Sequence, residues 1–102
     1  MTKTARIGEI EIPRISGGKI HPTLKGTALS QTQKNQVEGI LIEKIETSSY
    51  AWQTGLRQGD IIVIANRYRV TNLEEFRSVV NKSQPLLLNI QRGNEAFFVV
   101  LR

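Results

Sequence analysis

The stretch Thr54-Gly-Leu-Arg-Gln-Gly-Asp-Ile-Ile-Val-Ile-Ala-Asn-Arg-Tyr-Arg-Val70 decides the fold. Gly55 is placed to end a short helix at the C′ position, because a residue without a β-carbon adopts the left-handed backbone conformation at no steric cost. Leu56 would then fold back as the apolar contact that accompanies such a cap. The first part of the stretch therefore predicts a helix stop.

The second part of the same stretch predicts a strand between two turns. Gly59-Asp60 favours a turn in which the Asp side chain accepts hydrogen bonds from nearby backbone N–H groups. Ile61-Ile-Val-Ile64 is too short and too β-branched for a helix, which predicts a strand buried on both faces. Asn66 follows where the chain must reverse again.

The same signals place the other elements. A single helical turn is expected at 49–54, and a polar segment without periodicity predicts a loop at 30–38. The pair Gly93-Asn94 between two apolar runs indicates a hairpin. Strands are expected at 24–29, 39–45, 61–65, 68–70, 86–92 and 96–102.

A longer helix follows the quoted stretch. Thr71-Asn-Leu-Glu74 fits a capping box, in which the Thr71 hydroxyl accepts from the Glu74 N–H and the Glu74 carboxylate reaches back. The helix is expected from Leu73 to about Asn81, with Leu73, Phe76 and Val80 on one face. It ends before Pro85, because the residue before a proline avoids the helical conformation.

Residues 1–18 are predicted to be a linker or the remainder of a preceding domain, with Ser16-Gly17-Gly18 as a flexible hinge. Residues 19–102 form the domain. Its elements predict a small β-rich α+β fold, a partly open barrel of five or six strands with one long and one short helix.

Composition fits a globular module, with 39% apolar and 23% charged residues. The net charge of +5 comes from basic residues scattered along the chain without a run. Aromatic residues do not alternate with these charges, so a solvated basic surface is favoured and a small nucleic-acid-binding domain stays a remote alternative. There is neither a run of about 18 apolar residues nor a signal-peptide core.

The residues offer little chemistry. The chain has one histidine (His21), one aspartate (Asp60) and no cysteine, and the turn accounts for Asp60. His21 precedes Pro22 without an obvious orienting partner, so a catalytic triad is not supported. A single His with scattered Glu residues predicts no metal site, and no nucleotide-binding motif occurs. We expect a non-enzyme without a cofactor.

Recognition of another polypeptide is the remaining class. If the long helix lies beside the strand at 24–29, the groove between them can accept an extended peptide as an added strand. A loop at one end, with N–H groups pointing inward, would hold a terminal carboxylate.

The motif Ser49-Tyr-Ala-Trp-Gln-Thr-Gly55-Leu56…Gly59-Asp60-Ile-Ile…Asn66…Val70 resembles the core S-P-A-x-x-A-G-L-x-x-G-D-x-I-x-x-x-N-x-x-x-V of bacterial PDZ domains. The resemblance extends over residues 20–102. It is closest to the second, C-terminal PDZ domain of HtrA-type periplasmic serine proteases, the DegQ/DegP family. That narrower assignment rests on Leu24-Lys-Gly-Thr-Ala-Leu29, on the chain ending just after the hairpin and on the linker-like N-terminus.

The resemblance implies a peptide-binding site, and this sequence departs from the family pattern in the carboxylate-binding loop of that site. The family's carboxylate-binding loop x-Φ-G-Φ falls on His21-Pro22-Thr23-Leu24, where Pro22 has no N–H and Thr23 replaces a glycine. One charge-assisted donor, worth about 1.5–3 kcal/mol, is therefore missing. We expect weak or absent affinity for free C-termini. The implied peptide-binding residues are His21, Pro22, Thr23, Leu24, Gly26, Phe76, Arg77 and Val80, of which Phe76 and Val80 are also explained by the core and Arg77 by a pairing with Glu74.

The resemblance also implies a role and a location. The expected function is a non-catalytic interaction module of a periplasmic Deg-type protease, which mainly assembles the oligomeric cage and secondarily tethers unfolded substrate. Tyr50 and Trp52 stand where the family has small residues or proline, so they are candidate interface residues. The alternative is a true peptide receptor that presents C-terminal or internal hydrophobic segments to a protease domain.

Overall fold

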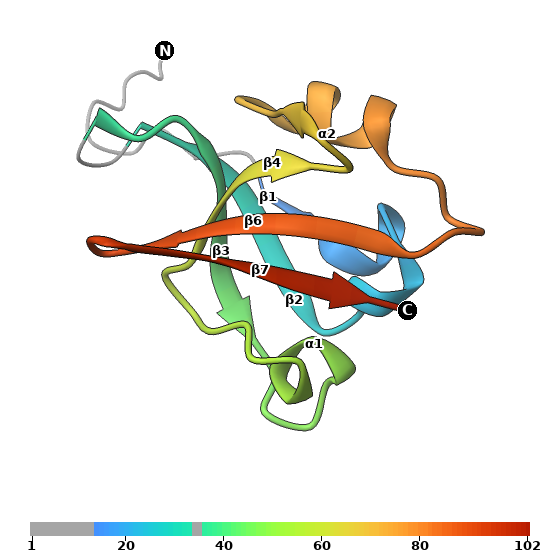
Figure 1. Cartoon of the computed structure of the whole chain (residues 1–102). Coiled ribbons are helices and arrows are strands. Elements are labelled where there is room, and N and C mark those ends of the chain that lie inside the picture. Colours follow the sequence, from blue (N-terminus) through green and yellow to red (C-terminus); the bar gives the residue numbers. More distant parts are fainter. Residues whose placement is uncertain (1–13, 34–35) are drawn as a thin grey trace, which may run out of the picture.

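The predicted strands and one further strand, β1 (Arg14–Ser16), join into a single antiparallel sheet, which carries two short α-helices and confirms the predicted β-rich α+β fold (Figure 1). The computed structural model describes residues 14–33 and 36–102. Within them the strand order is β1-β2-β3-β4-β6-β7, with β5 paired to β4. The elements are β1 (Arg14–Ser16), η1 (Gly17–Lys19), η2 (Pro22–Leu24), β2 (Thr27–Thr32), β3 (Gly39–Ile45), α1 (Tyr50–Gln53), β4 (Ile61–Ala65), β5 (Tyr68–Arg69), α2 (Leu73–Val79), β6 (Leu86–Arg92) and β7 (Glu95–Leu101).

The sheet curls into an open barrel. In Figure 1, β6 and β7 cross in front of β2 and β3, with α2 at one end of the molecule and α1 at the other. The core takes side chains from both helices and most strands, including fully buried Leu29, Ile62, Phe76 and Leu88. No helix among the described residues is long and apolar enough to cross a membrane.

The quoted stretch folds largely as predicted. The N–H of Gly55 donates to the Trp52 carbonyl and the N–H of Leu56 to the Ala51 carbonyl, which is the bonding of a Schellman cap. Gly55 has φ +109°, and Leu56 is fully buried. Both cap predictions are confirmed. The prediction of a strand buried on both faces was too broad, because Val63 and Ile64 are only half-buried.

Strand β2 lies three residues later than predicted. Residues 22–24 form the 3₁₀ turn η2 instead, and Gly26, at φ +90°, leads into the strand. The predicted loop at 30–38 was accordingly too long, because residues 30–32 complete β2. Proline at the first position of a helical turn is favourable, since its fixed φ suits the turn and its missing N–H has no partner there.

Helix α2 begins at Leu73 as predicted, but its capping box lies one residue later than predicted. The side chain of Asn72, not Thr71, accepts from the N–H of Glu75 at 2.8 Å. The Glu75 carboxylate, not that of Glu74, reaches back to the Thr71 N–H and hydroxyl, each at 2.8 Å. Asn is at least as favourable an N-cap as Thr, because its amide oxygen can accept a hydrogen bond from the N–H of the third helical residue. The helix is also shorter than expected, since Val80 is already extended.

Residues 14–18, which the sequence placed in the linker, lie within the sheet and its adjoining turn. Arg14–Ser16 form β1 on the edge of β2, and Ile15 packs against the core. Gly17 is buried, so the segment Ser16–Gly18 is not an open hinge. The alternation predicted around Ile10 and Ile12 lies outside the described residues.

Candidate functional site

His21 organises the turn that precedes β2. Its Nε2 lies 2.7 Å from the Gln84 carbonyl, and its Nδ1 accepts the Thr23 N–H at 3.2 Å and lies 2.7 Å from the Thr23 hydroxyl. A carbonyl only accepts and an amide only donates, so the neutral ring carries its proton on Nε2. His21 is thus a buried cap that ties η2 to the segment after α2. The expectation that it lacks an orienting partner was wrong, because Gln84 is distant in sequence.

The amides of the predicted carboxylate loop are already used. Pro22 has no N–H, Thr23 donates to the His21 ring, and the Leu24 N–H donates to the His21 carbonyl at 2.9 Å. The next amide, that of Lys25, donates to the Pro22 carbonyl at 3.2 Å. A ligand carboxylate at this turn would therefore have to break a bond within the protein to gain a backbone donor.

Strand β2 and helix α2 lie beside each other. At one end, the Leu73 N–H donates to the Gln31 side chain at 3.0 Å. At the other end, the His21 ring contacts the Gln84 carbonyl beyond the helix. These two bonds link the segments on either side of the predicted groove.

The eight predicted peptide-binding residues do not share one surface. His21, Leu24 and Phe76 are buried, and Phe76 and Leu24 belong to the core. Thr23, Gly26 and Val80 are half-buried, whereas Pro22 and Arg77 are exposed. Among the described residues Arg77 has no ion pair, so its predicted pairing with Glu74 is not present. Only part of the set is therefore accessible to a ligand.

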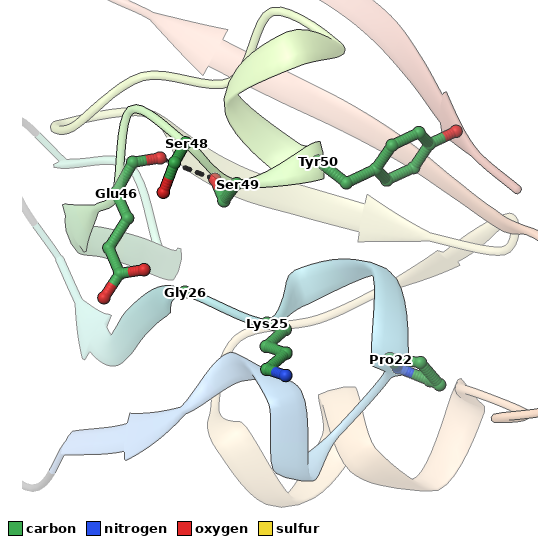
Figure 2. Close-up of a pocket in the computed structure, with 7 residues that line it drawn as sticks. All are labelled: Pro22, Lys25, Gly26, Glu46, Ser48, Ser49 and Tyr50. Carbon is green, nitrogen blue, oxygen red and sulfur yellow. Dashed lines mark hydrogen bonds between the residues drawn. The ribbon is translucent and has the colours of Figure 1, made fainter.

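Pro22 and Gly26 face α1. Together with Lys25, Glu46 and Tyr50 they line a pocket of about 340 Å³, which Figure 2 shows between η2 and the start of α1. The structure thus brings two predicted peptide-binding residues next to the predicted interface residue Tyr50.

The two aromatic residues of α1 differ in accessibility. The Tyr50 side chain is 43% exposed, and its hydroxyl accepts from the Arg102 N–H at 3.3 Å. Trp52 is half-buried, and the Arg57 guanidinium carbon lies 3.6 Å from its ring centroid. That stacking covers one face of the indole ring. Of the two, Tyr50 is the one that a partner could reach without rearrangement.

Tyr50 borders an exposed apolar strip on β7. Phe98 and Val100 are 68% and 43% exposed and alternate with buried Val99 and Leu101, so they share the outer face of the strand. Within the described residues β7 pairs with β6 alone, so its other edge is open. We call Tyr50, Phe98 and Val100 the β7 strip.

Asp60 forms an ion pair that sequence analysis missed. Its carboxylate accepts from Arg92 Nε and from a terminal nitrogen of the same guanidinium, both at 2.7 Å, and from the Arg57 N–H at 2.8 Å. The hydrogen bonds from its own guanidinium to Asp60 raise the pKa of Arg92. The Arg57 bond is the turn predicted for Asp60. Arg92 lies 32 residues away, and no local pattern links the two.

The described residues hold no group of three His, Cys, Asp or Glu side chains that could bind a metal ion.

Known proteins provide the remaining evidence. No family model matches the chain. It is 32% identical to the Escherichia coli K12 periplasmic serine endoprotease DegP over 90 residues, which cover 87% of this chain and 19% of that protein. It is 37% identical to the E. coli K12 periplasmic pH-dependent serine endoprotease DegQ over 89 residues, covering 85% and 20%. The chain thus spans about a fifth of these relatives.

A solved structure shows the fold. The HtrA3 PDZ domain bound to the phage-derived ligand FGRWV superposes with a TM-score of 0.64 at 23% identity, covering 89% of this chain and 85% of that one.

Proposed function

Because the chain is a PDZ domain homologous to part of the DegP and DegQ proteases, we propose that it binds a polypeptide segment as an added strand on the outer edge of β2, beside α2. The observation that carries this is the β1–β2 pairing, in which the edge already holds an extended segment with an apolar side chain docked against the core. The parent protein is then a periplasmic HtrA-type serine protease involved in protein quality control, with this domain as its second PDZ.

The expected ligand is an internal hydrophobic segment rather than a free C-terminus. The occupied amides of η2 support this, since they leave no ready set of donors for a carboxylate. An internal segment needs only the main-chain bonds of β2 and an apolar contact, and both are independent of a chain end.

Nuclear magnetic resonance tests this proposal on the whole chain. The peptide Phe-Gly-Arg-Trp-Val, which was bound by the HtrA3 domain, is titrated as the free acid and as the C-terminal amide. We expect shifts of amide signals in β2 and α2 with both forms and similar affinities. Signals of β7 serve as the internal control surface. Low-micromolar binding that is lost on amidation would overturn the preference for internal segments, and no binding of either form would overturn the receptor function.

Assembly of the parent oligomer is a second candidate, favoured by the β7 strip. Exposed apolar side chains next to an open strand edge are suited to docking against another domain. Phe98→Glu should weaken self-association in sedimentation experiments on this chain and on its full-length parent. Tyr68→Glu is the matched control, because Tyr68 is 62% exposed but lies on β5. Equal sedimentation of wild type and both variants would refute this role for the strip.

A further inference from the structure

The outer edge of β2 is occupied by the chain itself. Strand β1 pairs with it antiparallel, with Ile15 opposite Leu29 and Ser16 opposite Ala28. Directly opposed residues of a strand pair point to the same face, so Ile15 is directed with Leu29 toward the core. Ile15 packs on that core as a partly buried side chain. In Figure 1, β1 lies beside β2, in the place where an added strand would lie.

Gly17 fits a space that admits no larger residue. A β-carbon built on Gly17 would lie 2.6 Å from the Leu24 carbonyl oxygen and would collide with the Thr27 hydroxyl. On the neighbouring Gly18, the nearest atom to such a β-carbon is Lys25 Cα, at 3.4 Å. The backbone at Gly17 therefore packs closely into the turn that precedes β2, whereas a β-carbon on Gly18 would make ordinary van der Waals contact with Lys25.

After β1 the chain continues into the turn η1, whereas a bound peptide could end there. The Gly17 carbonyl accepts the N–H groups of Ile20 at 2.9 Å and His21 at 3.0 Å. Ser16, Lys19 and Lys82 line one pocket, so the turn η1 also reaches the segment that follows α2. β1 and η1 therefore occupy the space beside β2, β1 along its edge and η1 near its N-terminal end.

We infer that residues Arg14–Lys19 are a tethered occupant of the β2 edge, which an external peptide must displace before it can bind. This inference rests on the proposed peptide-binding function of that edge. Within the described residues, the three residues Arg14–Ser16 of this segment pair with β2. Attachment to the domain gives the segment an effective concentration in the millimolar range, which lowers the apparent affinity of any competitor.

Two glycine variants and one engineered disulfide, which can be formed and reduced again, test the inference on the full chain. Gly17→Ala should force β1 off the edge, and Gly18→Ala is the matched control with the same added methyl group. The double variant Ser16→Cys with Ala28→Cys places two thiols directly opposite each other in a chain that has no other cysteine. Cα atoms of opposed antiparallel residues lie about 4.5–5.5 Å apart, which suits a disulfide. Oxidation then fixes β1 in place, and reduction releases it.

Binding of labelled Phe-Gly-Arg-Trp-Val amide is measured for each form. We expect Gly17→Ala to bind at least about tenfold more tightly than wild type, because the occluded state no longer competes. Gly18→Ala should match wild type, and the oxidised double variant should not bind until it is reduced. In the wild type, peptide binding should move the amide signals of residues 14–19 to the positions of an unstructured chain.

The outcomes separate the two claims. Equal affinity of wild type, Gly17→Ala and the oxidised double variant would overturn the tethered occupant and leave peptide binding at this domain standing. No binding by any form, including the reduced double variant, would overturn the receptor function and the inference with it. The reduced and oxidised states share one sequence, so a folding defect of Gly17→Ala cannot produce the expected difference between them.

Discussion

The stretch from Thr54 to Val70 and the edge from Arg14 to Leu29 are stabilised in different ways. The first is held by an ion pair of the buried Asp60 carboxylate, a Schellman cap and a turn that bonds to two other elements. In the second, η2 and β2 contribute Leu24 and Leu29 to the core, whereas β1 is held, within the described residues, by the pairing of Arg14–Ser16 with β2 and by the contact of Ile15 with the core. The first arrangement fixes a scaffold, and displacement by a peptide requires that β1 can leave the second without unfolding the sheet. A domain that binds by adding a strand needs both properties, because the edge has to change while the sheet does not.

Removal of the Asp60 carboxylate should have the largest effect. Asp60→Ala removes the carboxylate that accepts from Arg92 and from the Arg57 N–H, so that Arg92 keeps only its hydrogen bond to the Gly55 carbonyl among those described, and the Asp60 side chain is only 1% exposed. Loss of this buried carboxylate, an acceptor of three hydrogen bonds, is expected to lower the free energy of unfolding by about 2–3 kcal/mol, measured by urea denaturation.

Arg14→Ala is the control for Asp60→Ala. It breaks the 4.0 Å contact with Glu43, and its side chain is 55% exposed. A change below about 0.5 kcal/mol is expected for it. If both variants lose the same stability, the contrast between the two regions is wrong.

Substitution of Asn66 should cause the second-largest loss of stability. It has φ +52°, its amide donates to the Val79 carbonyl at 2.9 Å, and its oxygen accepts the Leu87 N–H at 3.0 Å. Asn66→Ala loses both bonds and strains the left-handed backbone, so we expect a loss of about 2–3 kcal/mol in urea denaturation. Asn66→Gly removes the same bonds without that strain and should be less destabilising. An alanine variant as stable as wild type would contradict the role of Asn66 as a tie between β4, α2 and β6.

The stretch from 54 to 70 was readable from sequence because its signals are local. Gly55 and Leu56 act within one turn, and the backbone needs of each turn select its residues. The Asp60–Arg92 pair and the Asn66 contacts escaped prediction because they join segments that only the sheet brings together. At the edge, local signals misled: Gly26 lay within the segment 24–29 that was predicted to be a strand, while His21 and Gln84 are joined by a contact over a distance of 63 residues.

Substitution of His21 tests the edge and should have a smaller effect on stability. His21→Ala removes the cap of η2 and the bond to Gln84, and each neutral bond contributes about 1 kcal/mol. The loss should be mainly local. Hydrogen exchange of the Thr23 and Leu24 amides should accelerate more than that of β4 and β6. His21→Asn, which retains a capping oxygen, should protect these amides better than alanine does. Uniform acceleration across the sheet would show that the edge is not an independent unit.

Glu75 should give the smallest effect, and it depends on pH. The Thr71 N–H, followed by the Thr71 hydroxyl, lowers the pKa of Glu75 in the folded state. Its stabilising contribution is therefore fully present above the ordinary glutamate pKa of about 4.3 and is lost as the pH falls through the lowered value. Glu75→Gln should melt below wild type at pH 7, and the difference should shrink as the pH falls below about 4.

Glu74→Gln removes the same charge from the same helical turn without touching Thr71, so it separates the cap from the interaction with the helix dipole. The melting difference of Glu75→Gln from wild type should exceed that of Glu74→Gln at pH 7. If the Glu75→Gln and Glu74→Gln variants melt at the same temperature, the bonds from Thr71 to Glu75 contribute nothing beyond the charge. The start of α2 is then held by the Asn72 side chain and by the Gln31–Leu73 bond to β2. In that case the helix that borders the edge would depend on β2 itself, and opening of the edge would also loosen α2.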